Sequence, residues 1–381
     1  MQRHDLLIVG AGPVGLALAL FLKDAGLDII LADARAAHAA AEDPRILALA
    51  HGTRLSLEQL GVWQGLPATP IKAIHISQQG SFGRAMLHAA DYDIPALGHV
   101  MPAGALAGAL RRKVDEAGIP VLDGTEVSHL APGADDVIAS LKGQHAGTLS
   151  VRLAACAEGG MNAGDDDMVE HDYHQHALIS QVAVTGGHHN TAFERFTSAG
   201  PAALLPCAQG FAVVHVVAAD AADSLLELDD HTYLARLQAI FGHRVSLTAV
   251  TDRLRYPLLL RYRKTPVGQR TVWLGNAAQT MHPVAGQGFN LALRDVRAFA
   301  DLLIERGDDP GNTALLGEYG STRGLDRLGT IRFTDSLVRL FSNDIAPLRH
   351  ARGAGLFALD LCPPLRHFVA KRMMFGARAW P

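Results

Sequence analysis

Three glycines near the amino end of the chain constrain its fold more than any other feature. The apolar run at residues 6–22 reads LLIVGAGPVGLALALFL and places Gly10, Gly12 and Gly15 in the pattern G-x-G-x-x-G. Glycines at this spacing are typical of a buried strand that turns tightly into a buried helix. A strand, a helix and a second strand, together a βαβ unit, are therefore predicted at residues 6–9, 13–25 and 28–32.

This glycine turn predicts a dinucleotide site. Gly10 allows the tight turn, Gly12 lets a pyrophosphate approach the backbone, and Gly15 lets the helix and strand pack closely. Asp33 ends the second strand, where its carboxylate can accept hydrogen bonds from ribose hydroxyls. The alternative is a glycine-rich turn without a ligand, and these residues do not distinguish FAD from NAD.

The composition describes a globular chain with a charge asymmetry. Of 381 residues, 49% are apolar and 19% are charged, which provides enough apolar surface for a packed core. The net charge of −4 gives no reason to expect nucleic acid as a partner. Residues 331–381 nevertheless hold eight Lys or Arg against three Asp, on an otherwise acidic chain. This basic, apolar tail indicates either an anionic surface as partner or solvated helix faces.

Cysteine usage and hydropathy predict the compartment. Cys156, Cys207 and Cys362 are scattered without C-x-x-C spacing, which favours a reducing compartment and argues against disulfides or a zinc site. The run at residues 6–22 is as apolar as a signal peptide, but glycines and a proline interrupt it and no small-residue cleavage site follows. We therefore expect a cytoplasmic protein, either free or attached peripherally to the inner face of a membrane.

The remaining patterns predict an α/β fold built from discontinuous pieces. Short alternating runs at residues 71–97 and 176–259 predict an antiparallel sheet. Residues 331–381 predict a C-terminal helical segment with breaks at Pro347 and Pro363. The inserted sheet interrupts a Rossmann-like nucleotide-binding domain predicted at residues 1–70, 98–175 and 260–330.

A second glycine-bearing turn lies at residues 275–295, GNAAQTMHPVAGQGFNLALRD. A buried-looking strand precedes it, and a loop with Pro283, Gly286 and Gly288 leads into a helix that begins near Phe289. A helix N-terminus presents unpaired backbone N–H groups and the positive end of a dipole, which favour an anionic ligand. Because it follows the first fingerprint along the chain, this turn predicts a flavin held at both ends.

These segments are similar to the class A flavin-dependent aromatic hydroxylases. Within that family the chain resembles the phenol hydroxylases of ubiquinone biosynthesis, in particular the 2-polyprenyl-6-methoxyphenol hydroxylases. The resemblance covers essentially the whole chain, and it implies that the Rossmann-like domain binds FAD and the inserted sheet forms a substrate domain. It rests on residues 275–295, on FERFTSAGPAALLP at 193–206, on TDSLVRLF at 334–341 and on LALAHGTRLSLEQLGVW at 47–63.

The resemblance assigns roles to particular residues. Asp33 would hold the adenosine ribose, Arg45 would contact the flavin phosphate or ribityl region, and Pro283 would lie beside the isoalloxazine in the catalytic site. Backbone N–H groups of the second turn would face the flavin pyrimidine edge, where reduced flavin carries negative charge. The implied cofactor-binding residues are Gly10, Gly12, Gly15, Asp33, Arg45, Glu158, Gly159, Gly275, Asn276, Gly286, Gln287, Gly288, Phe289 and Asn290.

The activity that the resemblance implies is FAD-dependent monooxygenation. NAD(P)H would reduce FAD, O₂ would form a flavin C4a-hydroperoxide, and its distal oxygen would pass to a polyprenyl-methoxyphenol. Two alternatives stay open: hydroxylation at another ring position in the same pathway, and a non-catalytic flavoprotein subunit of a ubiquinone-biosynthesis complex. The second alternative draws on Glu158, which stands where the family usually carries Asp, and on the helix predicted near Pro102, which lacks the polar groups that relatives direct at the flavin.

The sequence offers fewer clues to the substrate site. Leu205, Pro206 and Val213 on the predicted sheet are candidate wall residues, with plain core packing as the alternative. His75 and His215 are candidates to assist phenol deprotonation or to serve as structural histidines. The pattern H-x-x-H-x-H at His171, His174 and His176 falls where a loop entering an edge strand is expected, and metal binding needs converging ligands. We therefore predict no metal.

Overall fold

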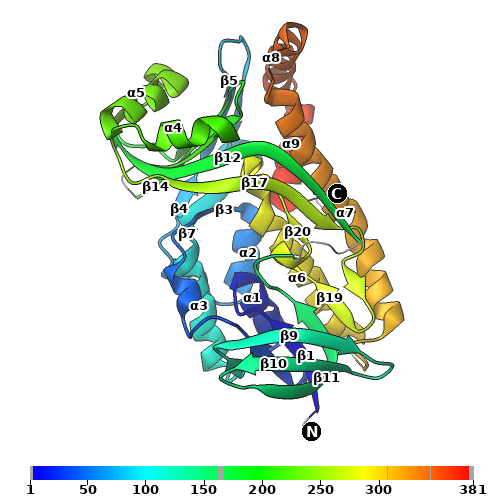
Figure 1. The fold of residues 1–381 in the computed structure, drawn as a ribbon. Coiled ribbons are helices and arrows are strands. Elements are labelled where there is room, and N and C mark those ends of the chain that lie inside the picture. Colours follow the sequence, from blue (N-terminus) through cyan, green and yellow to red (C-terminus); the bar gives the residue numbers. More distant parts are fainter. Residues whose placement is uncertain (1–2, 162–166, 209, 307, 344, 377–381) are drawn as a thin grey trace.

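A computed structural model describes residues 3–161, 167–208, 210–306, 308–343 and 345–376. Residues 162–166 of the segment predicted at 98–175, and residues 377–381 of the predicted tail, lie outside the described residues. Figure 1 shows two large sheets, one above the other, with long helices along one side. This arrangement confirms the predicted α/β fold class.

The first sheet is built on the N-terminal glycine turn. Among the described residues its strands follow the order β18-β19-β11-β1-β2-β8, and β10 and β9 extend it from β11. The central strand β1 is parallel to its neighbours, with Leu6 opposite Leu153 on one side and Ile29 on the other. The bounds are β1 Arg3–Val9, β2 Ile29–Ala32, β8 Val121–Leu122, β9 Thr125–Pro132, β10 Val137–Gly143, β11 Gly147–Cys156, β18 Val267–Gly268 and β19 Thr271–Trp273.

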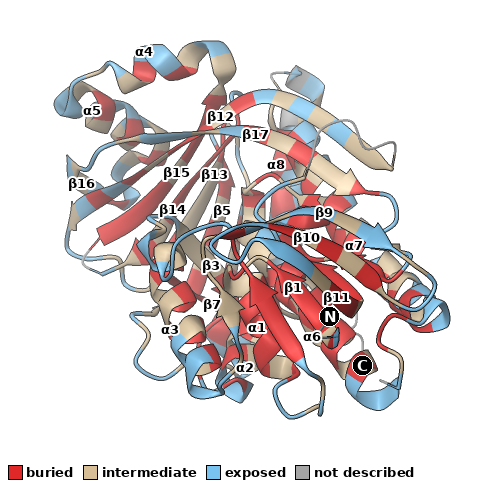
Figure 2. Ribbon diagram, turned by 60° about the horizontal axis from the view of Figure 1, so that its bottom comes forward, coloured by how far each residue is buried: buried red, intermediate tan, exposed pale blue. Residues whose placement is uncertain are grey.

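The central parallel strands of this sheet are apolar on both faces. Helices pack on one face, and β9 and β10 pack on the other. Figure 2 shows buried residues along most of β1 and along the helix that follows it. The core joins Leu6, Leu16, Leu110 and Phe299, so α1, α3 and α6 share one cluster with the sheet. These helices are α1 Pro13–Phe21, α3 Ala103–Glu116 and α6 Gln287–Arg306.

The second sheet forms the upper layer in Figure 1. Its described strands follow the order β20-β17-β12-β15-β14-β13-β5-β6, with β16 paired to β12. The two helices α4 (Ala222–Leu226) and α5 (Asp230–Phe241) cover its outer face. The strand bounds are β5 Ala73–Gln78, β6 Arg84–His88, β12 Met168–Thr185, β13 Thr191–Phe196, β14 Pro201–Cys207, β15 Gly210–Ala218, β16 Ser246–Val250, β17 Leu254–Arg263 and β20 Gln279–Thr280.

A small sheet and the C-terminal helices complete the fold. The strand order β3-β7-β4 forms a three-stranded antiparallel sheet near the second sheet, and Ile71, Val100 and Ala192 join the two in one apolar cluster. The segment predicted as a helical tail is helical, and α9 begins at Pro363 as expected. The bounds are β3 Ile46–Ala50, β4 Thr69–Ile71, β7 Gly98–Pro102, α2 His51–Gln59, α7 Thr313–Phe341, α8 Ala346–Leu361 and α9 Pro363–Phe375.

The structure corrects two details of the expected second sheet. The sheet is not wholly antiparallel, because β13 runs parallel to β5, with Phe193 opposite His75. The H-x-x-H-x-H pattern lies within the long strand β12, which pairs with β17 along this part and with β15 only from Gln175 onward, and not in a loop entering an edge strand. Alternation in sequence reveals neither the direction of a strand nor its neighbours, so both errors have the same cause. The domain bounds remain a prediction.

Buried ion pairs fasten α7 to α6. Arg323 Nε donates to Asp295 Oδ1 at 2.7 Å, and both side chains are almost fully buried. Asp295 also accepts a hydrogen bond from Gln279, and Arg323 also contacts Asp326. Each charge is therefore compensated by partners that the fold alone brings together.

Replacing Asp295 by Ala should lower the free energy of unfolding by about 3 kcal/mol, because the change removes one partner of a buried charge. Urea denaturation followed by circular dichroism measures this loss. Asp301→Ala is the matched control on the same helix, since Asp301 pairs with Arg297 at the surface. It should cost less than about 1 kcal/mol, and equal losses for both variants would contradict the account.

Candidate active site

The first glycine turn leaves no room for side chains where the chain crosses itself. A Cβ on Gly15 would lie 2.0 Å from the Gly10 carbonyl oxygen, and one on Gly10 would lie 2.8 Å from the Ala157 oxygen. Gly12 is open by contrast, since a Cβ on Gly12 would meet no atom closer than Arg35 Nη2, at 3.8 Å. No side chain caps α1, so its first backbone N–H groups face this opening.

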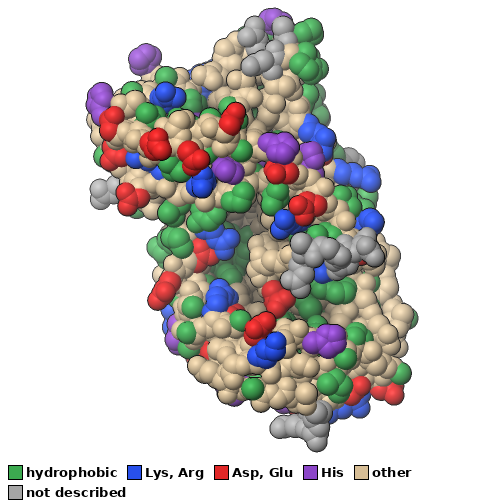
Figure 3. Space-filling model, in the orientation of Figure 1, with side chains coloured by type: hydrophobic (Ala, Val, Ile, Leu, Met, Phe, Trp, Pro, Cys, Tyr) green, Lys and Arg blue, Asp and Glu red, His purple; other side chains and the backbone are tan. Residues whose placement is uncertain are grey.

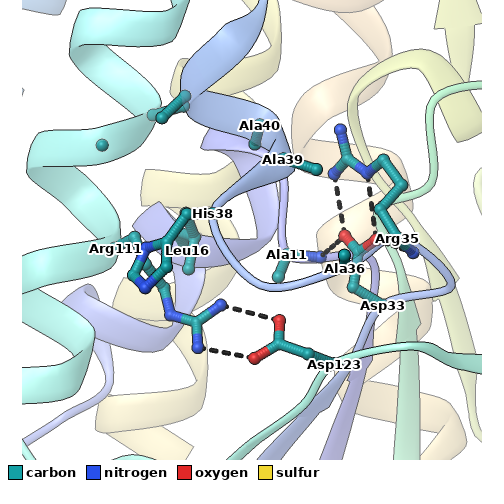
Figure 4. Close-up of a pocket in the computed structure, with 13 residues that line it drawn as sticks. Ala11, Leu16, Asp33, Arg35, Ala36, His38, Ala39, Ala40, Arg111 and Asp123 are labelled. Carbon is teal, nitrogen blue, oxygen red and sulfur yellow. Dashed lines mark hydrogen bonds and ion pairs between the residues drawn. The ribbon is translucent and has the colours of Figure 1, made fainter.

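Asp33 lies at the end of β2 beside this opening, as predicted from the sequence. Its carboxylate accepts hydrogen bonds from the Ala11 N–H at 2.7 Å and from the Arg35 guanidinium at 2.8 and 3.0 Å (Figure 4). Burial raises the pKa of Asp33, but the bonds from Arg35 and Ala11 outweigh it and the pKa is lowered. Asp33 is therefore an anion that Arg35 already engages.

A shallow, open hollow adjoins Asp33. Small residues of the chain between β2 and β3, among them Ala36 and Ala39, line it together with Gly108 of α3. The ion pair between Arg111 and Asp123 closes its far side (Figure 4). The small apolar residues of this lining, beside the Asp33 carboxylate, suit the adenosine end of a dinucleotide.

Arg45, Glu158 and Gly159 lie at exposed positions. The Arg45 Nε donates to Asp43 Oδ1 at 2.9 Å. Glu158 follows the end of β11, and partial loss of hydration together with the charges of Asp33 and Glu126 raises its pKa. The Glu158 carboxyl thus lies close enough to Asp33 for the two charges to interact.

The second glycine turn, at residues 275–295, packs against the first in space. A Cβ on Gly275 would lie 3.0 Å from a Val14 methyl group at the start of α1, and Gly275 has a φ of 60°. Asn276 is exposed in the same short turn. At the far end of the loop, a Cβ on Gly286 would lie 3.1 Å from the Ala48 side chain of β3. The two turns are therefore neighbours in space.

Asn290 fixes the start of α6 against β3. Its Oδ1 accepts from the Ala50 N–H at 2.8 Å and from the Thr53 hydroxyl at 2.7 Å. Its Nδ2 donates to the carbonyls of Ala48 and Gly286, at 3.0 and 2.7 Å. The buried amide is thus fully used within the protein, and only its backbone is free to serve a ligand.

The loop before α6 is held in an unusual conformation. Pro283 precedes a short 3₁₀ turn, Val284–Gly286, in which Ala285 and Gly286 both have left-handed backbone angles. Gln287 is buried and donates to the Ala285 carbonyl, whereas Gly288 is exposed and has no atom within 4 Å of a Cβ position. Phe289 packs on the core of the first sheet. The first turn of α6 therefore presents backbone N–H groups at an open surface.

The predicted substrate residues do not share one face of the second sheet. We call the face that packs toward Ile71 and Val100 the inner face; Leu205 lies on it. Val213 is fully buried in the cluster under α4 and α5, and Pro206 pairs with Phe211 of that cluster. Val213 and Pro206 thus fit the alternative of core packing, because alternation does not show which face points inward, and a substrate role for Leu205 stays a prediction.

The candidate histidines also lie away from the inner face. His75 contacts Phe193 on the outer face, and His215 Nδ1 lies 3.3 Å from the Tyr233 hydroxyl of α5. Burial lowers the pKa of His215 to about 4. Over the ranges that the structure describes, no group of three or more His, Cys, Asp or Glu is placed to hold a metal ion.

Two polar residues near the second turn have no counterpart in the sequence-based predictions. His282 is buried directly before Pro283, where its Nδ1 accepts the Val284 N–H and its ring meets Tyr173 edge-on. Glu194 lies on β13 between Ala192 and Phe196. Neither belongs to a pattern of glycines or paired acids, and only the strand register could have placed Glu194 on the inner face.

The observed positions suit FAD. Gly12 and the uncapped start of α1 leave space for a pyrophosphate, the hollow beside Asp33 suits adenosine, and the open start of α6 suits the flavin edge. Figure 3 shows the surface hollowed between the two sheets, which is where such a ligand would lie. The binding roles of the individual residues remain predictions.

Comparison with known proteins gives a consistent result. The FAD binding domain family model matches residues 3–327. Ubiquinone hydroxylase UbiL of Rhodospirillum rubrum is 33% identical, over 99% of this chain and 91% of its own length. The 3-demethoxyubiquinol 3-hydroxylase of Escherichia coli is 28% identical, over 97% and 98%. The crystal structure of p-nitrophenol 4-monooxygenase PnpA from Pseudomonas putida shares the fold, with a TM-score of 0.77 at 16% identity, over 99% and 100%.

Replacing Gly15 by Ala should abolish retention of FAD, because the added methyl group would force α1 away from the first turn. The ratio of flavin to protein absorbance after purification measures this effect. Gly317→Ala in α7 is the control, since nothing lies within 4 Å of its Cβ position. Full flavin content in the Gly15 variant would contradict the proposed pyrophosphate site.

Proposed function

Because this chain belongs to the FAD-binding hydroxylase family of ubiquinone biosynthesis, we propose that it hydroxylates a polyprenyl-methoxyphenol with NAD(P)H as the electron donor. The protein is an FAD-dependent hydroxylase that uses O₂ and a phenolic substrate. The proposal adds the prenylated methoxyphenol and the source of electrons. The observation that carries it is the approach of the second glycine turn to the first, at Gly275 and Val14.

Different residues of the chain would bind different parts of the cofactor. The first turn and the start of α1 would bind the pyrophosphate, and Asp33 the ribose after exchanging part of its contact with Arg35. Bound FAD supplies the redox chemistry, accepting hydride and activating O₂. The N–H groups at the start of α6 would orient the flavin and stabilise negative charge at its pyrimidine edge. Pro283 would exclude water beside the ring.

The inner face of the second sheet supports an apolar, uncharged substrate. The strands β5, β13, β14 and β15 present apolar residues to it, among them Ile76, Leu205 and Val214. The guanidinium of Arg195 points to the opposite face, where it donates to Ser77. On these described strands no Arg or Lys faces inward to pair with an aromatic carboxylate. A prenylated phenol without a carboxyl group therefore fits this face better than a benzoate.

A second candidate function differs in the ring position that is hydroxylated. The Escherichia coli relative, of similar length, is named a 3-demethoxyubiquinol 3-hydroxylase. Hydroxylation at that position of a demethoxyubiquinol is the alternative function for this chain. It would use the same cofactor site and the same apolar face.

The C-terminal helices support contact with a membrane surface, where a prenylated substrate dissolves. Phe357, Leu361, Leu365 and Phe368 on α8 and α9 are all at least 44% exposed. Apolar side chains also gather over α8 at the upper right edge in Figure 3. Exposed apolar residues beside a basic segment are typical of peripheral binding to anionic lipid. Over the described residues, each helix is too short or too polar to cross a bilayer.

The purified protein should be yellow and should consume NAD(P)H faster when a short-chain prenyl-methoxyphenol is present. The product should carry one oxygen atom from isotopically labelled O₂, because the enzyme transfers it to the ring. Mass spectrometry detects the label and its ring position. Phenol-stimulated peroxide release without labelled product would contradict the hydroxylase activity and favour a non-catalytic flavoprotein subunit.

The double variant Leu361→Ser, Phe368→Ser should bind vesicles of anionic phospholipid about tenfold less tightly, because it removes two exposed apolar contacts. Vesicle flotation measures this change. Ile304→Ser is the control, since Ile304 is 55% exposed at the end of α6, outside the C-terminal helices. Equal flotation of all three proteins would contradict the membrane contact.

A further inference from the structure

Glu194 occupies a distinctive place on the inner face of the second sheet. It lies on β13 opposite Ala203 of β14 and Ile76 of β5, two apolar residues. Along the strand it stands between Ala192, in one cluster with Ile71 and Val100, and Phe196, in one cluster with Val284. Val284 directly follows Pro283. Glu194 therefore faces the space between the second sheet and the loop expected to hold the flavin ring.

The carboxyl of Glu194 is surrounded by protein and yet unengaged. Throughout the described parts of the chain it has no hydrogen bond or ion pair, and its side chain keeps some accessible surface. This partial accessibility leaves the side chain within reach of solvent or a ligand. Burial alone raises the pKa of this carboxyl to about 8. An ionisable group left unpaired in this way is costly for the fold, which is typical of a functional position.

We propose that the Glu194 carboxylate is the catalytic base that accepts the phenol proton as the ring is hydroxylated, a role that rests on the function proposed above. The phenol O–H bond breaks, a new O–H bond forms on a Glu194 oxygen, and no electrons pass between the two groups. The electron-rich phenolate is the better acceptor for an oxygen atom. A general base works most efficiently when its pKa lies near the pH at which the enzyme works.

Other ionisable groups near the inner face are weaker candidates. His282 is buried with a pKa lowered to about 3, so it holds a proton poorly. The Tyr173 hydroxyl donates a hydrogen bond to Asp335 of α7 at 2.9 Å. Burial, and to a smaller extent this bond, raises the pKa of Tyr173. Tyr256 of β17 lies close enough to Arg45 to interact with its charge. Burial raises the pKa of the Cys207 thiol, which lies in the inner-face cluster. Charged groups on packed elements are engaged elsewhere: Arg195 with Ser77, Arg339 with Asp335, Arg352 with the carbonyls of Phe341 and Asn343, and Asp360 with the Met86 N–H.

The test uses FAD-loaded enzyme, a short-chain prenyl-methoxyphenol and the variant Glu194→Gln. Glutamine has the size of a protonated glutamic acid, so flavin content and circular dichroism should match the wild type. After anaerobic reduction, single-turnover hydroxylation by the wild type should rise with pH, with its midpoint near pH 8, and level off only above that pH. In Glu194→Gln the rate should fall about 100-fold at neutral pH, with little change in KM, and the rise should vanish. Glu227→Gln, at an exposed position after α4, should behave as wild type.

A second readout does not depend on turnover. Calorimetry in buffers of different ionisation heat should show that phenol binding near pH 8 releases part of a proton from the wild type, because the phenol hydroxyl stabilises the carboxylate form. Glu194→Gln should release none. A variant that keeps the wild-type pH profile and proton release would overturn the proposal, even if its rate falls. Should the wild type form no hydroxylated product, the proposed function fails, while proton release still decides the role of Glu194.

Discussion

The structure depends on one long-range approach, in which the second glycine turn packs on the start of the first helix. Gly275 meets Val14 with no space for a side chain between them. Asn290 then uses every hydrogen-bonding atom of its amide to join α6 to β3 and its surroundings, across 240 residues of sequence to Ala50. Because both contacts are buried and close-fitting, they fix two helix N-termini on one side of the molecule, where a single extended cofactor can reach both.

The second sheet supplies the face available to a substrate, which the two glycine turns do not provide. Its outer face is covered by α4 and α5, so the inner face alone is available to a substrate. That face is apolar except for a few polar groups, among which Glu194 is an unpaired carboxyl. Binding and positioning are thus assigned to the backbone of the glycine turns, and recognition of the ring to the sheet.

The sequence predicted the backbone features well because they depend on local rules. The glycine spacing predicted β1, α1 and the position of Asp33, and Pro363 marked the start of α9. The errors concern relations between distant strands. The parallel pairing of β13 with β5 and the burial of Val213 depend on neighbours that alternation cannot identify. Glu194 was missed for the same reason, since a lone glutamate in a strand becomes informative only when its face is known.

Hydrogen–deuterium exchange of the apoprotein with and without FAD tests the central claim most directly. If the two glycine turns hold opposite ends of one cofactor, adding FAD should slow amide exchange at residues 11–16 and at residues 285–290 together. Both segments should follow the same dependence on FAD concentration, with one FAD bound per chain. Protection of the first segment alone, with unchanged exchange at the second, would contradict the account.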